Sequence, residues 1–218
     1  MGGHFGSVSR NLPVLNAVKS HVQDSTLILV DVQEKLVPPL WQKRRFLVHI
    51  ECLLRACRIL EVPILVTEQY PEGLGATLEQ LKELIDPEAP VIEKIHFSAW
   101  GSKSFRESLL GSSNRRQVIL CGIEAHICVL QTARDLIGAG FDVHLPVDAV
   151  TSRHVLDYRV GCDQAKGCGA SLTTVETLIF GWLQRGDDSR FRPIQEFIKS
   201  KDRQLMDVDD SLNESTLL

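Results

Sequence analysis

Short apolar runs alternate along the chain with segments that have helical spacing. The runs that predict buried strands are 25–32, 62–67, 90–95, 118–121, 141–147 and 170–173. Apolar residues recur every three or four positions in the segments that predict helices, which are 44–60, 78–85, 103–110, 125–133, 158–166, 175–183 and 191–198. Strands and helices that alternate in this way predict an α/β fold, a three-layer α/β/α sandwich around a six-stranded parallel, Rossmann-like sheet.

The pattern is weaker at both ends of the chain. Residues 1–23 contain no Asp or Glu and only two permanent positive charges, Arg10 and Lys19. Residues 202–218 are rich in acids and poor in large core residues, which favours a flexible segment. We therefore predict an N-terminal arm (1–24), with a short helix around 14–21, one domain (25–200) and a flexible C-terminal tail (201–218).

Composition narrows the class of protein. The 218 residues are 44% hydrophobic and 24% charged, with a formal net charge of −4, which is typical of a globular domain and argues against a general nucleic-acid surface. No apolar stretch is long enough to span a bilayer, and the start lacks a signal-peptide pattern. We expect a small-molecule substrate, no nucleic-acid or membrane partner, and a cytoplasmic protein, with a mitochondrial transit peptide as the alternative.

A cysteine lies at a position where reactive groups are readily placed. The stretch 116–133, RQVILCGIEAHICVLQTA, predicts a buried strand, a break at Gly122 and then a helix whose first turn contains Cys128. Unpaired backbone N–H groups and the helix dipole favour a thiolate at such a helix start. The alternative is that Cys128 is a small buried residue, as most free cysteines are. The six cysteines are scattered through apolar runs, so we expect them to be reduced.

Two further polar residues follow predicted strands. Asp31 follows LILV, and Lys94 follows PVIE. Each taken singly has a structural explanation, because charges at strand ends are common. The carboxyl ends of parallel strands, however, share one edge of the sheet, where ligands bind. A carboxylate base, a cation and the Cys128 thiol at that edge are the groups that a nucleophilic cysteine requires.

These segments carry a family resemblance. LILVDVQ, EKIHFSAW and VILCGIEAHICVLQTARDLIGAGFDVHLPVDAV resemble the isochorismatase-like cysteine hydrolase family, which includes nicotinamidases and N-carbamoylsarcosine amidases. The resemblance covers roughly residues 25–184. TEQYPEGLG and CGIEAHICVLQTARDL are most similar to the subgroup of isochorismatase domain-containing proteins. The resemblance implies a homo-oligomeric hydrolase.

The resemblance also implies a mechanism. It assigns a catalytic triad of Asp31, Lys94 and Cys128, and a non-proline cis peptide between Ile123 and Glu124. The backbone N–H groups of Glu124 and Cys128 then form an oxyanion hole. Attack by the Cys128 thiolate would cleave a C–N bond of a small amide or ureide through a thioester.

The chain departs from the metal-dependent members of the family. Nicotinamidases hold a metal through an Asp-x-His pair and a later His after the second strand, whereas this chain has Thr67-Glu68-Gln69-Tyr70 and no His in that loop. We therefore expect no metal and no cofactor. His126 is a second candidate for the base, in a Cys–His dyad, but an offset of two residues in a helix start turns the two side chains apart, which favours Asp31.

The sequence offers candidate residues for the substrate pocket and leaves two alternative functions. Candidates to shape the pocket are Gln33, Tyr70, Phe97 and Trp100, of which the aromatic residues are equally suited to the core or to a subunit contact. The alternatives are an enol-ether hydrolase of the isochorismatase type, which does not depend on the cysteine, and a non-catalytic binding or scaffold protein that retains the fold.

Overall fold

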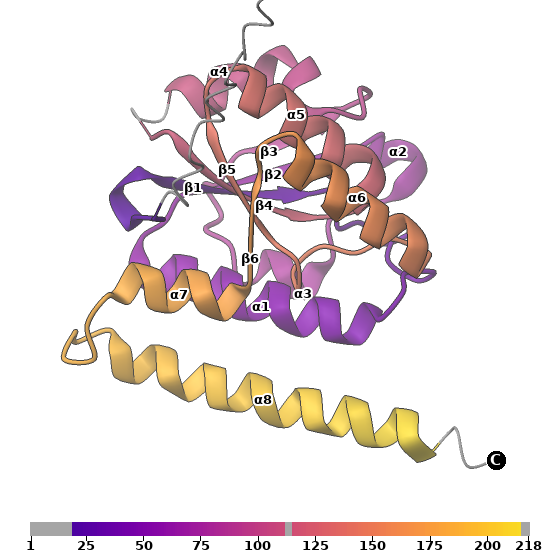
Figure 1. Ribbon diagram of the computed structural model, residues 1–218. Coiled ribbons are helices and arrows are strands. Elements are labelled where there is room, and N and C mark those ends of the chain that lie inside the picture. The colour runs from indigo at the N-terminus through magenta and orange to yellow at the C-terminus, as the bar shows by residue number, and fades with distance from the viewer. Residues whose placement is uncertain (1–18, 112–114, 215–218) are drawn as a thin grey trace, which may run out of the picture.

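The sheet has the predicted parallel architecture. The computed structural model describes residues 19–111 and 115–214, with side chains described to residue 207. Within that part of the chain, six parallel strands pair in the order β3-β2-β1-β4-β5-β6 (Figure 1). The strands are β1 (Ser25–Val30), β2 (Ile64–Gln69), β3 (Val91–Lys94), β4 (Gln117–Gly122), β5 (Asp142–Pro146) and β6 (Ser171–Thr173). The prediction of a three-layer α/β/α sandwich is confirmed.

Helices cover both faces of the sheet. The α-helices are α1 (Lys43–Leu60), α2 (Pro71–Leu74), α3 (Glu79–Lys82), α4 (Lys103–Gly111), α5 (Leu130–Gly138), α6 (Val155–Gly167), α7 (Val175–Leu183) and α8 (Phe191–Glu214). Helices α1 and α7 pack on one face with α8 outside them, whereas α4, α5 and α6 pack on the other (Figure 1). Short turns η1 (Val22–Asp24), η2 (Ala99–Gly101) and η3 (Ala125–Val129) complete the described elements.

The strand order creates a switch point between β1 and β4. The chain builds β1, β2 and β3 outward on one side and then β4, β5 and β6 on the other. The connections that leave β1 and β4 therefore diverge, which opens a crevice at the carboxyl ends of these strands. Val30, the last residue of β1, pairs with Thr67 on β2 and with Gly122 on β4. Residues that follow these positions consequently meet at one edge.

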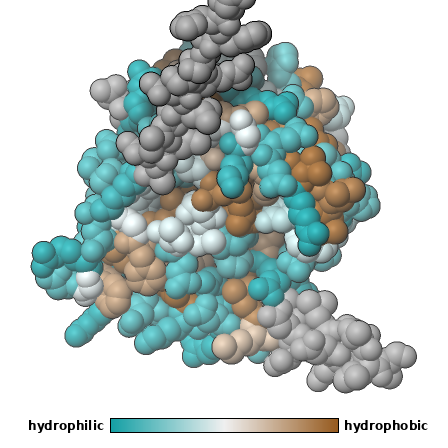
Figure 2. Space-filling view, in the orientation of Figure 1, coloured by the Kyte–Doolittle hydropathy of each residue, from teal (hydrophilic) through white to brown (hydrophobic). Residues whose placement is uncertain are grey.

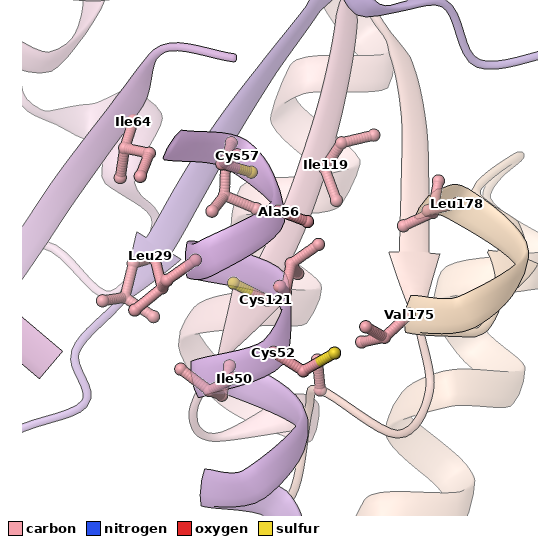
Figure 3. Packing of buried hydrophobic residues seen from close by; sticks show 14 of the residues in the cluster. Leu29, Ile50, Cys52, Ala56, Cys57, Ile64, Ile119, Cys121, Val175 and Leu178 are labelled. Carbon is pink, nitrogen blue, oxygen red and sulfur yellow. The ribbon is translucent and has the colours of Figure 1, made fainter. Parts of the chain in front are cut away.

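The core beneath α1 contains most of the buried thiols. Cys52 and Cys57 on α1 and Cys121 on β4 lie among side chains such as Leu29 and Ile119 (Figure 3). Each of these cysteines is free. All six residues of β1 and of β4 are buried, as expected for central parallel strands covered on both faces.

The surface is largely hydrophilic in the view of Figure 2, with hydrophobic side chains gathered on the α6 side. There Leu156 and Val160, one helical turn apart, are 68% and 42% exposed. Among the described residues, no helix combines the length and the apolarity that crossing a membrane requires.

The C-terminal helix is longer than its apolar pattern predicts. We expected a helix over 191–198 and a flexible tail over 201–218, but α8 continues to Glu214, and residues 215–218 lie outside the description. The helix continues because Ile194 and Ile198 are buried against the α1 side, and the buried Lys201 pairs with Glu176 at 3.1 Å. Most of the predicted N-terminal arm, and of its helix around 14–21, lies outside the described residues.

One helix is shorter than its pattern predicts. The apolar spacing over 78–85 predicts an amphipathic helix, but α3 spans only Glu79–Lys82. Leu81 and Ile85 are buried as that pattern requires. A turn that leads to Pro87 takes over before a second helical turn forms.

Candidate active site

Asp31 lies at the switch point, directly after β1. Its backbone has φ 54°, a left-handed conformation, and its side chain is fully buried. Thr67 Oγ1 donates a hydrogen bond to Oδ1 at 2.7 Å, and Lys94 Nζ donates to Oδ2 at 2.7 Å. Both carboxylate oxygens therefore have a donor, as a buried carboxylate requires.

Lys94 is the last residue of β3, and its side chain is also fully buried. Besides Asp31, its ammonium group donates to Gln69 Oε1 at 2.7 Å and approaches the carbonyl oxygens of His96 and Phe97 at 3.3 and 3.2 Å. These oxygens supply the hydrogen bonds that a buried ion pair needs in addition to its partner charge. The Asp31–Lys94 pair is thus built into the sheet edge by β1, β2 and β3.

The loop that provides the two carbonyl groups is fixed to α5. The backbone N–H of Ala99 donates to Thr132 Oγ1 at 2.9 Å, and Ser98 Oγ hydrogen-bonds Asp135 Oδ2. This attachment holds the segment after β3 over the ammonium group of Lys94. The sheet edge therefore stays closed around the ion pair.

Cys128 faces this ion pair from the turn that follows β4. It lies in the π-helical turn η3 and is 7% exposed. Burial and the Asp31 carboxylate raise the pKa of the Cys128 thiol to about 12, whereas Lys94 lowers it, and both side chains are hydrogen-bonding partners of the thiol. The expectation that the helix start favours a thiolate is therefore wrong. Desolvation and the neighbouring carboxylate outweigh the ammonium group.

The carboxyl group of Asp31 is shifted in the same direction. Burial raises its pKa above the ordinary value, against the opposing effects of Lys94, Thr67 and Cys128. A raised carboxyl pKa reduces the difference between the base and the thiol, so proton transfer from sulfur to oxygen becomes less unfavourable. The arrangement holds a neutral thiol beside a base instead of a pre-formed thiolate.

The turn between β4 and Cys128 is held close to β1. Gly122 has φ +117°, and a Cβ at this position would lie 2.1 Å from the carbonyl oxygen of Val30, so only glycine fits. The backbone N–H of Ile123 donates to the same carbonyl at 2.9 Å. The Ile123–Glu124 peptide bond is cis, at the position where the resemblance implies one. Within the described residues, the backbone N–H of Glu124 has no hydrogen-bond acceptor.

His126 points to other partners than Cys128. Its Nδ1 lies 3.0 Å from Ser152 Oγ, and its Nε2 lies 4.0 Å from Asp157 Oδ2. Asp31, and not His126, is therefore the carboxylate or imidazole group that lies beside the thiol, as the helical offset predicts.

The four candidate pocket residues separate into two groups. Gln33 is fully buried, and its amide bonds the backbone of Gln69 and Gly75, so it joins the end of β2 to the residue after α2. Trp100 packs edge-on against Phe141, which precedes β5, at a ring distance of 5.9 Å. Tyr70 and Phe97 are 49% and 55% exposed.

A cavity lies beside Tyr70. Its volume is about 530 Å³, at the carboxyl end of β3, and Tyr70, Lys94 and His96 are among the residues that line it. No group of three or more His, Cys, Asp or Glu residues that could hold a metal ion is present in 19–111 or 115–214.

Sequence reasoning missed Thr67 and Gln69, which bind Asp31 and Lys94 directly. Both lie at the end of β2, and β2 lies between β1 and β3 in the sheet. Thr67 and Gln69 are also polar residues at the carboxyl end of a strand, as Asp31 and Lys94 are. Once β2 is known to lie between β1 and β3, Thr67 and Gln69 are the residues expected to connect Asp31 with Lys94.

Comparisons with known proteins agree with this architecture. The family model described as Isochorismatase domain matches residues 25–177. The chain is similar to isochorismatase domain-containing protein 2 of Danio rerio, with 38% identity over 80% of this chain and 86% of the other. It also resembles the solved structure of the MAR1 ribonuclease from Caenorhabditis elegans, with 38% identity, coverage of 83% and 92%, and a TM-score of 0.78.

A more distant solved structure shares only the fold. This hydrolase from Escherichia coli is octameric and of unknown specificity. It is 23% identical, with coverage of 89% and 98% and a TM-score of 0.79.

Proposed function

The chain belongs to the isochorismatase domain family of hydrolases, and we propose that it is a cysteine hydrolase that cleaves a C–N bond of a small amide or ureide. One observation carries the proposal: a carboxylate, an ammonium group and a thiol from three different strand ends share one buried cluster. Burying the Asp31–Lys94 ion pair costs free energy because both charges lose their hydration. A pair that activates the neighbouring Cys128 thiol has a functional reason to be retained in spite of this cost.

The first chemical step uses Asp31 as the base. Asp31 takes the proton from the Cys128 thiol, and the sulfur attacks the carbonyl carbon, whose π electrons move to the oxygen. Lys94 remains protonated and stabilises both the carboxylate and the developing thiolate. The raised pKa of Asp31 makes it a better proton acceptor than an ordinary carboxylate.

The second step divides the substrate. The tetrahedral oxyanion collapses, the C–N bond breaks, and the nitrogen leaves with the proton that Asp31 received from the thiol. Water then attacks the thioester, with Asp31 again as the base, and the acid product leaves as Cys128 regains its proton. The net reaction consumes one amide and one water and releases one acid and one amine or ammonia.

The backbone N–H groups of Glu124 and Cys128 serve in this mechanism as the oxyanion hole. The N–H of Glu124 has no acceptor among the described residues, so it is available to a ligand. Preorganised donors of this kind typically contribute about 10²–10³-fold to the rate. Tyr70 and Phe97 are proposed to border the substrate, and a homo-oligomer to complete the surface around them.

A substrate panel tests the proposal. Purified wild type and Cys128→Ala are incubated with nicotinamide, N-carbamoylglycine, simple aliphatic amides and p-nitrophenyl acetate, an activated ester that acylates thiols. We expect wild-type hydrolysis of at least the ester and one C–N compound. Cys128→Ala should reduce this turnover by about 10³-fold or more, with an unchanged thermal melt.

The same panel, extended by isochorismate, separates the alternatives. An enol-ether hydrolase of the isochorismatase type would retain its turnover of isochorismate in Cys128→Ala. A single-stranded RNA oligonucleotide is included because a similar solved structure is a ribonuclease. RNA cleavage that survives the loss of Cys128, or no turnover of any compound by wild type, would count against the cysteine hydrolase.

A further inference from the structure

Three consecutive residues after β5 contact three consecutive residues of the turn that leads to Cys128. Arg153 donates from its backbone N–H and its Nε to Glu124 Oε2, at 3.0 and 3.1 Å. The backbone N–H of Ala125 donates to the carbonyl oxygen of Thr151 at 2.9 Å. Ser152 Oγ hydrogen-bonds His126 Nδ1 at 3.0 Å. We call Thr151–Arg153 the clamp segment.

The clamp segment is itself fixed. Thr151 and Ser152 are 2% and 0% exposed. Thr151 Oγ1 donates to the carbonyl oxygen of Trp41 at 2.9 Å, and the backbone N–H of Trp41 donates to the carbonyl oxygen of Ser152 at 3.0 Å. The preceding residue, Val150, forms a parallel bridge with Gly122 on β4. Thr151 and Ser152, which are buried and bonded to Trp41, can hold the turn in one orientation, whereas Arg153 reaches Glu124 from the surface.

Helix α6 supports the same turn from behind. A Cβ on Gly161 would lie 2.7 Å from the carbonyl carbon of Ala125 and 2.7 Å from the backbone nitrogen of His126. Real Cβ atoms do not approach backbone atoms so closely, so α6 packs against the turn with no spare space. A glycine within a helix reduces its stability relative to alanine, and here the close approach is the structural reason for it.

We propose that the clamp segment and Gly161 are positioning elements that fix the direction of the Glu124 backbone N–H toward the reaction's oxyanion. The inference rests on the proposed cysteine hydrolase and adds to it the residues that aim its oxyanion hole. The groups that act on the thiol, Asp31 and Lys94, lie after β1 and on β3 and are not part of this turn. A displaced turn should therefore impair attack on a carbonyl group more than it impairs the thiol itself, because a carbonyl reaction needs the donor correctly aimed.

Two reactions of Cys128 separate these effects. p-Nitrophenyl acetate acylates the thiol through an oxyanion, whereas iodoacetamide alkylates it by displacement at a saturated carbon, without an oxyanion. Both rates are measured at one alkaline pH, by p-nitrophenolate release and by peptide mass spectrometry. The ratio of acylation to alkylation then reports the oxyanion hole, and a change in thiol access or ionisation alters both rates.

The matched pair of variants is Gly161→Ala and Gly181→Ala. Both glycines are inside helices, but a Cβ at Gly181 meets nothing within 4 Å. We expect Gly161→Ala to lower the acylation-to-alkylation ratio by about tenfold to a hundredfold. Gly181→Ala should leave the ratio unchanged. An equal ratio in both variants would overturn the role of Gly161.

A second variant covers the case in which Gly161→Ala does not fold. Arg153→Ala removes the Nε contact with Glu124 but keeps the backbone contact, so we expect a smaller reduction of the ratio, about threefold to tenfold. Arg153→Lys should restore part of it. An unchanged ratio in Arg153→Ala would overturn the role of the clamp segment. The proposed function fails by a different result, which is wild-type acylation that persists in Cys128→Ala.

Discussion

Cys121 and Cys128 are buried thiols on one continuous segment, yet their surroundings differ. Cys121 lies within β4 among apolar side chains (Figure 3). Its thiol donates to the carbonyl oxygen of Ile28 at 3.5 Å. Burial alone raises its pKa. Cys128 is nearly as buried, but a carboxylate and an ammonium group face it.

The comparison shows that a thiol pKa does not by itself identify a nucleophile. Both thiols have raised pKa values, and burial is the largest cause for each. The difference is that Cys128 has a partner able to accept its proton. In this fold, reactivity depends on the groups that the sheet edge places around the sulfur, and a free thiol in the core has none of them.

Loss of Asp31 should have the largest effect on the difference in reactivity between Cys128 and Cys121. Asp31→Asn removes the proton acceptor, and we expect turnover of p-nitrophenyl acetate to fall by about 10²–10⁴-fold. It also leaves the buried Lys94 ammonium without its counter-charge, which should lower the free energy of unfolding by about 3–5 kcal/mol. Stopped-flow absorbance and urea denaturation measure the two effects.

The control for this variant is Asp148→Asn. Asp148 also follows a strand, β5, but its carboxylate caps α7 by accepting from the backbone N–H of Val175 at 2.9 Å. Turnover should survive in this variant. Equal losses of turnover in the two variants would mean that any strand-end charge matters and that Asp31 has no special relation to Cys128.

The pH dependence of alkylation should sharpen the comparison. Because the thiolate reacts and the pKa of Cys128 is raised to about 12, its labelling by iodoacetamide should rise with pH throughout the neutral and mildly alkaline range. Lys94→Met removes the group that lowers this pKa, so the pKa of Cys128 should rise further. At a fixed pH below the pKa, labelling should then slow about tenfold for each unit by which the pKa rises.

The exposed Lys103 provides the control for this measurement, since Lys103→Met changes a lysine whose side chain is 81% exposed. Labelling of Cys128 in Lys103→Met should match wild type. A labelling rate that reaches its plateau near neutral pH would contradict the raised pKa.

The smallest effect is expected at Cys121. Cys121→Ala removes a fully buried sulfur from the core beneath α1 and should lower the free energy of unfolding by about 1 kcal/mol. Turnover should not change, because no charged group depends on this thiol. Chemical denaturation and the ester assay on the same preparation measure both quantities. A large loss of turnover with little loss of stability would make Cys121 more than a core residue.

Much of the fold could be predicted from local patterns. The apolar runs identified the six strands of the described residues, most clearly β1 and β4, which lack polar alternation because both of their faces are buried. The same runs placed Asp31 and Lys94 at strand ends and Cys128 just beyond β4. Strand order was not available from these patterns, so the roles of Thr67 and Gln69, which depend on β2 lying between β1 and β3, were not predicted.

Features that depend on long-range packing were also missed. Gln33 is predicted to shape the pocket because its segment adjoins it, and no local pattern shows that its amide bonds the backbone of Gln69. The pKa of Cys128 was misjudged because a helix start is visible in the sequence, whereas desolvation is not. The clamp segment contacts residues far away in the chain, and no local spacing indicates such a contact.

The most direct test of the central claim is to identify the residue that is acylated. Wild type is mixed with p-nitrophenyl acetate, quenched in acid within the burst phase and digested, and the acetylated peptide is found by mass spectrometry. The account predicts an acetyl thioester on Cys128, none on Cys121 or Cys57, and a strongly reduced yield in Asp31→Asn. Turnover with Cys128 unmodified, or with the acetyl group on another residue, would contradict it.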